Sequence, residues 1–130
     1  MSNKTGRLIV EARSVESLLH HDSSRAKEEL GPSLGYMSSD MVPEADVNLG
    51  IRHVIRVPAD FKPHIEPHTH EVSQVYAVVG ELTVEVMLDD EKHEVSGPAG
   101  IFIPAGMRHT IRPLKGSGYM VVVVRGGEYK

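Results

Sequence analysis

Apolar and polar residues alternate along the chain after Leu49, which is the period of a β-strand with one buried face. The clearest example is segment 81–88, in which every even position is apolar. Glycine, proline and aspartate separate such segments at intervals of about ten residues, a spacing typical of all-β sandwiches and barrels. The pattern predicts seven strands, at 51–57, 74–79, 81–88, 93–95, 101–103, 109–112 and 119–124.

The first 48 residues lack this alternation and are predicted to form an arm. An apolar run at 7–12 would make an eighth, edge strand. Segments 14–21 and 24–30 are candidates for short helices, the second ended by Gly31 and Pro32. We expect residues 1–48 to pack on the outside of a barrel formed by residues 49–130, or to cross to a second subunit.

Composition narrows the class of protein. The 130 residues fit one domain, and 40% hydrophobic residues suffice for one core. A net charge of −4 argues against nucleic acid or an anionic membrane as a partner. The absence of cysteine excludes disulfides, thiolate zinc sites and cysteine nucleophiles. No apolar run approaches the roughly 20 residues of a membrane span. The default expectation is a cytoplasmic protein.

Three of the eight histidines stand in a pattern that suits a metal. His68 and His70 are two residues apart, so on a strand both would face the same side. Gln74 follows at an even spacing and would share that side, whereas Glu71 would face outward. His109 follows a Pro-x-Gly turn and opens a later strand, which a barrel can place beside the first. A single His-x-His pair is more often a surface feature, so the prediction of a metal site depends on all of these residues together.

Both segments resemble the motifs of a known family. The stretch from Pro67 to Gly80, with its two histidines, resembles the first motif of the cupin superfamily, and the stretch from Gly97 to His109 resembles the second. The resemblance covers residues 49–126. It implies an all-β double-stranded β-helix, or jelly-roll barrel, with the metal at its mouth.

This sequence departs from the family pattern at three points. Gln74 stands where the family usually has glutamate, only five residues separate Gln74 from Gly80, and Pro113 replaces an asparagine. With three imidazoles and a neutral amide as ligands, a divalent ion would keep its full charge and act as a stronger Lewis acid. Zinc, iron, nickel, manganese and copper all suit such ligands, and the alternative for Gln74 is that water takes its place.

Two further residues are candidates for catalysis. Tyr76 continues the parity of Gln74, so its hydroxyl would lie near the metal and could donate to a substrate oxygen. His53 shares the face of Ile51 and Ile55 and is expected to point into the barrel as an acid–base group. The alternative for both is an ordinary core residue with a satisfied polar atom. His20, His21 and His93 are interpreted as surface residues.

Two classes of function follow from the resemblance. The first is a metal-dependent enzyme on a small oxygenated molecule, by Lewis-acid chemistry of the isomerase, lyase or cyclase type, or as a dioxygenase. The second is a non-catalytic cupin that binds a small molecule or a metal. In either case the expected ligand is a small molecule rather than nucleic acid or membrane. We also expect a homodimer, from the family resemblance and because the arm has little core of its own.

Overall fold

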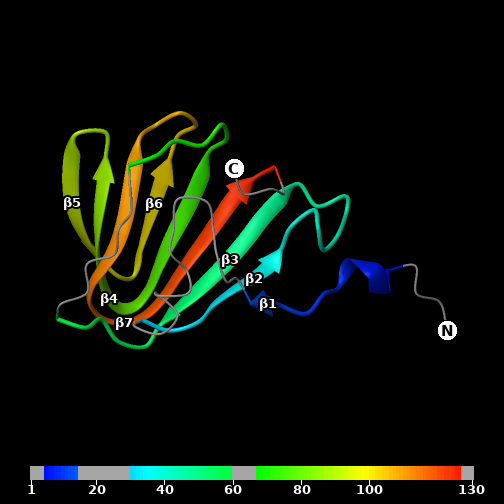
Figure 1. The fold of residues 1–130 in the computed structure, drawn as a ribbon, viewed down its shortest axis with the longest axis horizontal. Helices are drawn as coiled ribbons and strands as arrows, with labels where there is room; N and C mark the ends of the chain where they lie inside the picture. Colours follow the sequence, from blue (N-terminus) through cyan, green and yellow to red (C-terminus); the bar gives the residue numbers. More distant parts are fainter. Residues whose placement is uncertain (1–4, 15–29, 60–66, 127–130) are drawn as a thin grey trace.

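The fold is described from a computed structural model, which defines residues 5–14, 30–59 and 67–126 (Figure 1). The predicted helices at 14–21 and 24–30 lie outside these residues, except for their terminal residues Ser14 and Leu30. The elements, in order, are the 3₁₀ turn η1 (Gly6–Leu8) and the strands β1 (Arg13–Ser14), β2 (Ser33–Met37), β3 (Val47–Val54), β4 (Gln74–Leu88), β5 (Glu91–Ser96), β6 (Ala99–Ile103) and β7 (His109–Arg125).

All of the strands belong to one antiparallel sheet, as expected for an all-β jelly roll. The strand order is β1-β2-β3-β7-β4-β5, and β6 pairs with the first part of β4. The described part of the arm extends this sheet, because β2 pairs with β3 and β1 with β2. An ion pair between Arg7 and Glu44 ties η1 to the loop before β3. The division of the chain at residue 48 stays a prediction.

Two long strands replace four of the predicted short ones. β4 runs unbroken through Gly80, and β7 runs through Pro113 and Gly116. The two strands bend together, because Gly80 pairs with Gly118 and both have positive φ angles, of 89° and 158°. A Cβ atom on Gly118 would lie 2.0 Å from the carbonyl oxygen of Val79, so only glycine allows this close approach.

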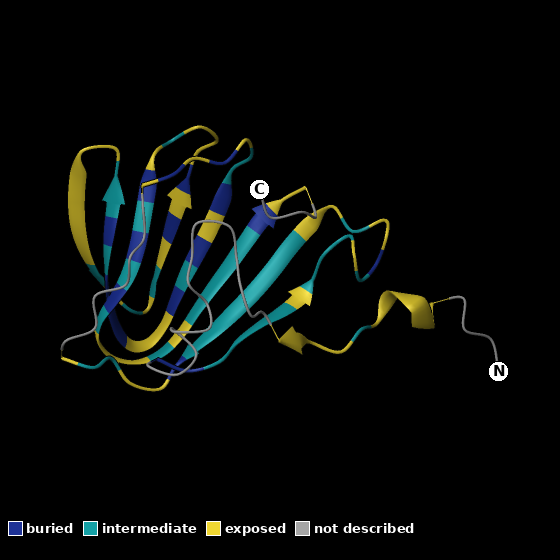
Figure 2. Cartoon of the chain, in the orientation of Figure 1, coloured by how far each residue is buried: buried dark blue, intermediate teal, exposed yellow. Residues whose placement is uncertain are grey.

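Alternation along β4 separates the inner side of the sheet from the outer side (Figure 2). The inner side chains of β3, β4, β6 and β7 form the core, and each large aliphatic side chain fully buried there contributes about 1.5–3 kcal/mol to stability. The least exposed of them are Val54, Val78, Leu82, Val84, Val86, Ile103 and Val124. Within the described residues, no helix is long and apolar enough to cross a membrane.

Candidate metal centre

The three motif histidines come from two chain segments that backbone hydrogen bonds hold together. His68 and His109 form an antiparallel bridge, in which each N–H donates to the other residue's carbonyl, at 3.2 and 3.0 Å. The N–H of Gly106 donates to the carbonyl of His70 at 2.9 Å. Gly106 has a φ of 83°, which the Pro-x-Gly turn requires. The turn predicted from the sequence therefore holds the two motifs side by side.

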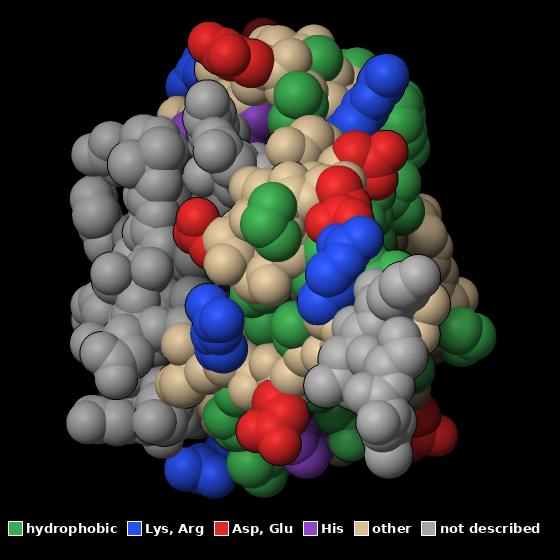
Figure 3. All heavy atoms as spheres, turned by 90° about the vertical axis from the view of Figure 1, so that its right-hand side faces the viewer, with side chains coloured by type: hydrophobic (Ala, Val, Ile, Leu, Met, Phe, Trp, Pro, Cys, Tyr) green, Lys and Arg blue, Asp and Glu red, His purple; other side chains and the backbone are tan. Residues whose placement is uncertain are grey.

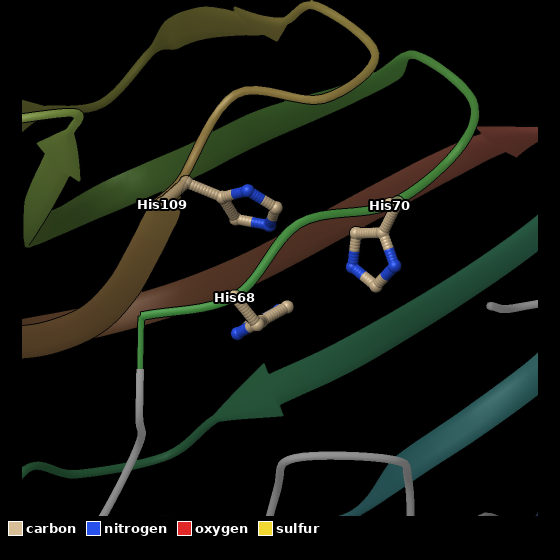
Figure 4. Close-up of side chains that lie close together, drawn as sticks. All are labelled: His68, His70 and His109. Atoms are coloured by element: carbon tan, nitrogen blue, oxygen red, sulfur yellow. The ribbon is translucent and has the colours of Figure 1, made fainter.

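The imidazole rings of these histidines converge on one buried point (Figure 4). His68, His70 and His109 are only 6%, 4% and 1% exposed, and their ring centroids are 4.5–5.2 Å apart. Each offers one ring nitrogen, and these three atoms all lie within 4.8 Å of one another. Ligands of a tetrahedral ion at 2.0–2.1 Å would lie about 3.3 Å apart, which small side-chain rotations would reach.

Gln74 lies beside the histidines at the start of β4 and is 2% exposed. Its Nε2 is 2.7 Å from Nε2 of His109. Its Oε1 is buried and has no hydrogen-bond partner among the described residues. Burying an amide oxygen without a partner costs about 1–3 kcal/mol. As placed, the amide N–H of Gln74 donates to Nε2 of His109, and a half-turn of the amide would instead point Oε1 at the same place, where a bound cation could be shared by both atoms.

The hydrogen bonding of His109 favours the form that binds a metal. Its Nδ1–H donates to the carbonyl oxygen of Met107 at 3.0 Å, which leaves the lone pair on Nε2 facing Gln74. Burial lowers the pKa of His109, against the opposing effect of the hydrogen bond to Met107. The ring is therefore neutral at pH 7, as a ligand must be. Neutral imidazoles and an unpartnered amide oxygen fit a divalent transition metal.

Among the described residues, no carboxylate belongs to this cluster. Within the described residues, no other group of three metal-binding side chains comes as close together. Glu71, the acidic residue nearest in sequence, is exposed, as its parity predicted. An ion held by these residues would therefore keep its full positive charge, which strengthens its effect on a bound oxygen atom.

The fold brings the two ends of one strand together to build this site. Gln74 is the first residue of β4, and His109 pairs with Leu88, which is the last. Fourteen steps of straight strand would separate those ends by about 46 Å. The short contact between Gln74 and His109 therefore requires the bend of β4 and β7 at their paired glycines.

The two candidates for catalysis lie in different places. Tyr76 is 6% exposed and lies on the inner side, two residues and so about 7 Å along β4 from Gln74. His53 stacks on Tyr119, with ring centroids 4.5 Å apart. Tyr119 pairs with Val79, which is on the outer side. His53 therefore faces away from the metal cluster, and its expected inward direction is wrong.

The reason for this error is that most apolar residues of β3, Val47, Leu49 and Ile51, lie on its outer side, whereas Val54 is the one large apolar residue on its inner side. Val54 is fully buried, so the even positions of β3 face the core. The sequence suggested the opposite, because Ile51 stands at an odd position. The catalytic roles of Tyr76 and His53 stay predictions. His93 is exposed, as predicted, whereas His20 and His21 lie outside the described residues. The carbonyl of Met107 is a feature that the sequence could not reveal, because any residue supplies a backbone oxygen.

Comparison with known proteins identifies similar folds among solved structures, but no matching sequence family. No protein-family model matches the sequence, and no curated protein is significantly similar to it. Solved structures do match. An RmlC-like cupin from Shewanella frigidimarina is 16% identical, with a TM-score of 0.55 and coverage of 73% of this chain and 75% of that one. A cupin superfamily protein from Desulfitobacterium hafniense is also 16% identical, with a TM-score of 0.55 and coverage of 72% and 74%.

A larger enzyme contains a similar unit. Oxalate decarboxylase from Bacillus subtilis, described with Mn(II) centres, is 14% identical, with a TM-score of 0.57. The match covers 78% of this chain and 27% of that one, so the chain spans about a quarter of the enzyme's length. At these identities the likeness establishes the fold alone. This chain has the fold of these cupins, as its motifs predicted, and carries a cluster of three histidines able to hold a metal.

Proposed function

We propose that this protein is a metal-dependent enzyme, in which His68, His70, His109 and Gln74 hold one divalent transition metal for chemistry on a small oxygenated molecule. The observation that carries the proposal is the buried cluster of three imidazoles beside the unpartnered Oε1 of Gln74. Zinc, iron, nickel, manganese and copper remain the candidate ions, and the Mn(II) centres of the similar oxalate decarboxylase support manganese among them.

Each residue has a distinct part in this proposal. When bound, the ion supplies a Lewis acid that polarises a carbonyl or enolate oxygen. The histidines and Gln74 add no negative charge, which preserves that effect. Tyr76 lies on the same inner face, where its phenol would donate a proton to, or hold, a substrate oxygen. The buried surroundings exclude bulk water, so these polar contacts are stronger than they would be in solution. The chemistry fits isomerase, lyase or cyclase reactions best.

A dioxygenase is the nearest alternative among enzymes. Its usual iron site of two histidines and one carboxylate is not matched here, because Gln74 replaces the carboxylate. The non-catalytic alternative has an observation in its favour. The residues that pair with Gln74 on the neighbouring strands, Ile103 and Val124, are both apolar and buried, which suits a site that only holds a ligand.

The proposal is tested by proton exchange on a simple probe. Metal-free protein is reloaded with each candidate ion, and the exchange of the methyl protons of pyruvate in D₂O is followed by NMR. We expect exchange that requires the ion and that is lost in His109→Ala. Tyr76→Phe should keep the ion but lose at least about 100-fold in rate, the lower range for loss of an acid–base group.

A second probe separates the enzyme from the alternatives. Acetohydroxamate is added to the protein reloaded with cobalt(II), and the visible spectrum reports whether an oxygen ligand reaches the ion. A saturable change without exchange on any probe carbonyl would favour the binding protein. No change would mean that the ion has no open position, which contradicts the enzyme proposal. Oxygen uptake by the iron-loaded protein would point to the dioxygenase.

A further inference from the structure

A cleft of about 280 Å³, which we call the edge cleft, opens between β5 and β6. It is lined by Val86 and Leu88 of β4, His93 and Val95 of β5, and residues 100–102 of β6. In the part of the chain that the structure describes, β5 and β6 each pair with β4 alone, so both have an unpaired edge. Because β5 pairs with β4 beyond the bend and β6 pairs with it before the bend, the cleft lies between the two layers of the fold.

The edge cleft is mainly apolar. Val86 and Ile101 are 1% and 8% exposed and form its floor, whereas Leu88 and Val95 are half-buried. His93 is exposed but pairs with Val86, so it faces the inner side of the sheet at the rim of the cleft. Among the described residues that line the cleft, none is Asp, Glu, Lys or Arg. On the side of the molecule where the N-terminus lies, in contrast, acidic and basic side chains are interspersed (Figure 3). The cleft therefore suits an uncharged, apolar group.

Both walls of the edge cleft adjoin the candidate metal centre. Leu88 pairs with His109, and Ile101 pairs with Tyr76. The side chains of directly paired residues lie on the same side of the sheet, with Cβ atoms about 4.5–5.5 Å apart. A ligand packed against Leu88 and Ile101 would therefore be one residue spacing from a candidate metal ligand and from Tyr76. The cleft thus leads from the edge of the sheet towards the histidine cluster.

We propose that the edge cleft binds the apolar part of an amphipathic substrate, whose oxygen-bearing head group lies at the metal beside Tyr76. This inference rests on the proposed function and adds a class of substrate to it. A cavity of about 150 Å³ holds benzene, so the edge cleft has room for an apolar chain or ring of roughly ten heavy atoms. Burial of this group favours binding and holds the head group in place. The expected substrates are medium-chain or aromatic carbonyl compounds and their enols.

Hydroxamates of two chain lengths test the cleft, because they share one metal-binding head group. Each is titrated into the cobalt(II)-loaded protein, and the visible spectrum gives its dissociation constant. We expect hexanohydroxamate to bind at least about 100-fold more tightly than acetohydroxamate, since burial of each of its four additional methylene groups favours binding about fourfold. Equal affinities in the wild type would overturn the proposal.

Substitutions on β5 locate this preference for the longer chain. Val95→Phe should remove it by filling the cleft, and should leave the affinity for acetohydroxamate unchanged. Val95→Thr keeps the shape but adds a hydroxyl, and should lower the preference about fivefold or more. Glu94→Phe is the matched control, because Glu94 is exposed and pairs with Glu85 on the outer side, and it should keep the preference. Circular dichroism checks the fold of each variant. A preference that survives in both Val95 variants would overturn the proposal.

The metal-free protein separates the cleft from the proposed function. 1-Hexanol is titrated into the metal-free wild type, and the methyl NMR signals of Val86 and Ile101 are followed. We expect saturable shifts that Val95→Phe abolishes, and a wild type without shifts would overturn the cleft whatever the metal does. Shifts without any response of the cobalt spectrum to either hydroxamate would support the cleft but contradict the proposed function. A response to acetohydroxamate without a preference for the longer chain would support the proposed function and reject the cleft.

Discussion

The two halves of β4 share one alternation but carry different surfaces. Residues 74–79 and 83–88 both bury alternate side chains on the inner side. On the outer side, the first half presents Val75 and Val79, whereas the second presents Glu85 and Met87. The partner strand β7 changes in the same way, from Val121 and Val123 beside the first half to Thr110 and Arg112 beside the second.

Burial alone does not distinguish the half of β4 that lies at the candidate metal site from the other half. Both inner sides are well packed, since Val78 and Val84 are almost completely buried. The first half differs because it begins with a buried polar residue, Gln74, and because its outer side lacks charge. The second half has the outer surface of an ordinary soluble protein, where the carboxylate of Glu85 accepts a hydrogen bond from Arg112 at 3.1 Å.

The largest effect is expected when one of the clustered histidines is removed. His109→Ala should lower metal affinity by more than about 100-fold, which exceeds the usual cost of losing an outer-shell partner. The added metal should then no longer raise the melting temperature, because stabilisation by a ligand requires binding. His93→Ala, on β5 beside the second half, is the control. If His109→Ala retained the thermal shift, the cluster would not be the metal site.

The next largest effect is expected at the bend between the two halves. Gly118→Ala should lower the free energy of unfolding by about 2 kcal/mol or more, because the residue has a positive φ and its Cβ would collide with Val79. Gly100→Ala is the matched control, since its Cβ would come no closer than 4.0 Å to a neighbouring atom. Urea unfolding of both variants measures the difference. Equal stabilities would mean that the bend does not depend on glycine.

Substitution of Gln74 by glutamate should have a smaller effect on metal affinity, and in the opposite direction. Gln74→Glu should bind a divalent ion about tenfold more tightly, because a carboxylate adds a full negative charge to the ligands. The same change should destabilise the metal-free protein, in which a buried carboxylate would have no cation. Competition with a chelator and thermal melts measure the two quantities. An affinity unchanged by Glu would indicate that residue 74 does not contact the ion.

The smallest effect on stability is expected in the second half of β4, residues 83–88, whose outer side carries Glu85. The hydrogen bond from Arg112 lowers the pKa of Glu85 below its ordinary value near 4.5. The carboxylate is therefore stabilised in the folded state above that value, and this stability is lost as the pH falls through the lowered pKa. Glu85→Gln should cost a few tenths of a kcal/mol at pH 7 and nothing at pH 2–3. A constant difference over this range would mean that the ion pair is not responsible.

Much of this arrangement could be predicted from the sequence, because it depends on local patterns. Alternation located the strands, and parity placed Gln74 on one side and Glu71 on the other. The turn before His109 indicated where the second motif reverses. Each of these features depends on a few neighbouring residues and on the fixed geometry of a strand.

The features that the sequence did not predict are those that depend on curvature and on both faces of a strand. Gly80 was expected to end a strand, but it pairs with Gly118 and lets two strands bend without a break. His53 was placed on the wrong side, because most apolar residues of β3 lie on its outer side. Alternation alone cannot distinguish an apolar outer side of a strand from a side that faces the core.

The most direct test of the proposed metal site is the metal content of untagged protein, measured by elemental analysis together with the protein concentration. We expect a ratio near one divalent transition metal ion per chain in the wild type, and near zero in His68→Ala, His70→Ala and His109→Ala. A ratio near zero in the wild type, unchanged after each ion is added back, would contradict this expectation, and the buried histidines would then be a structural cluster.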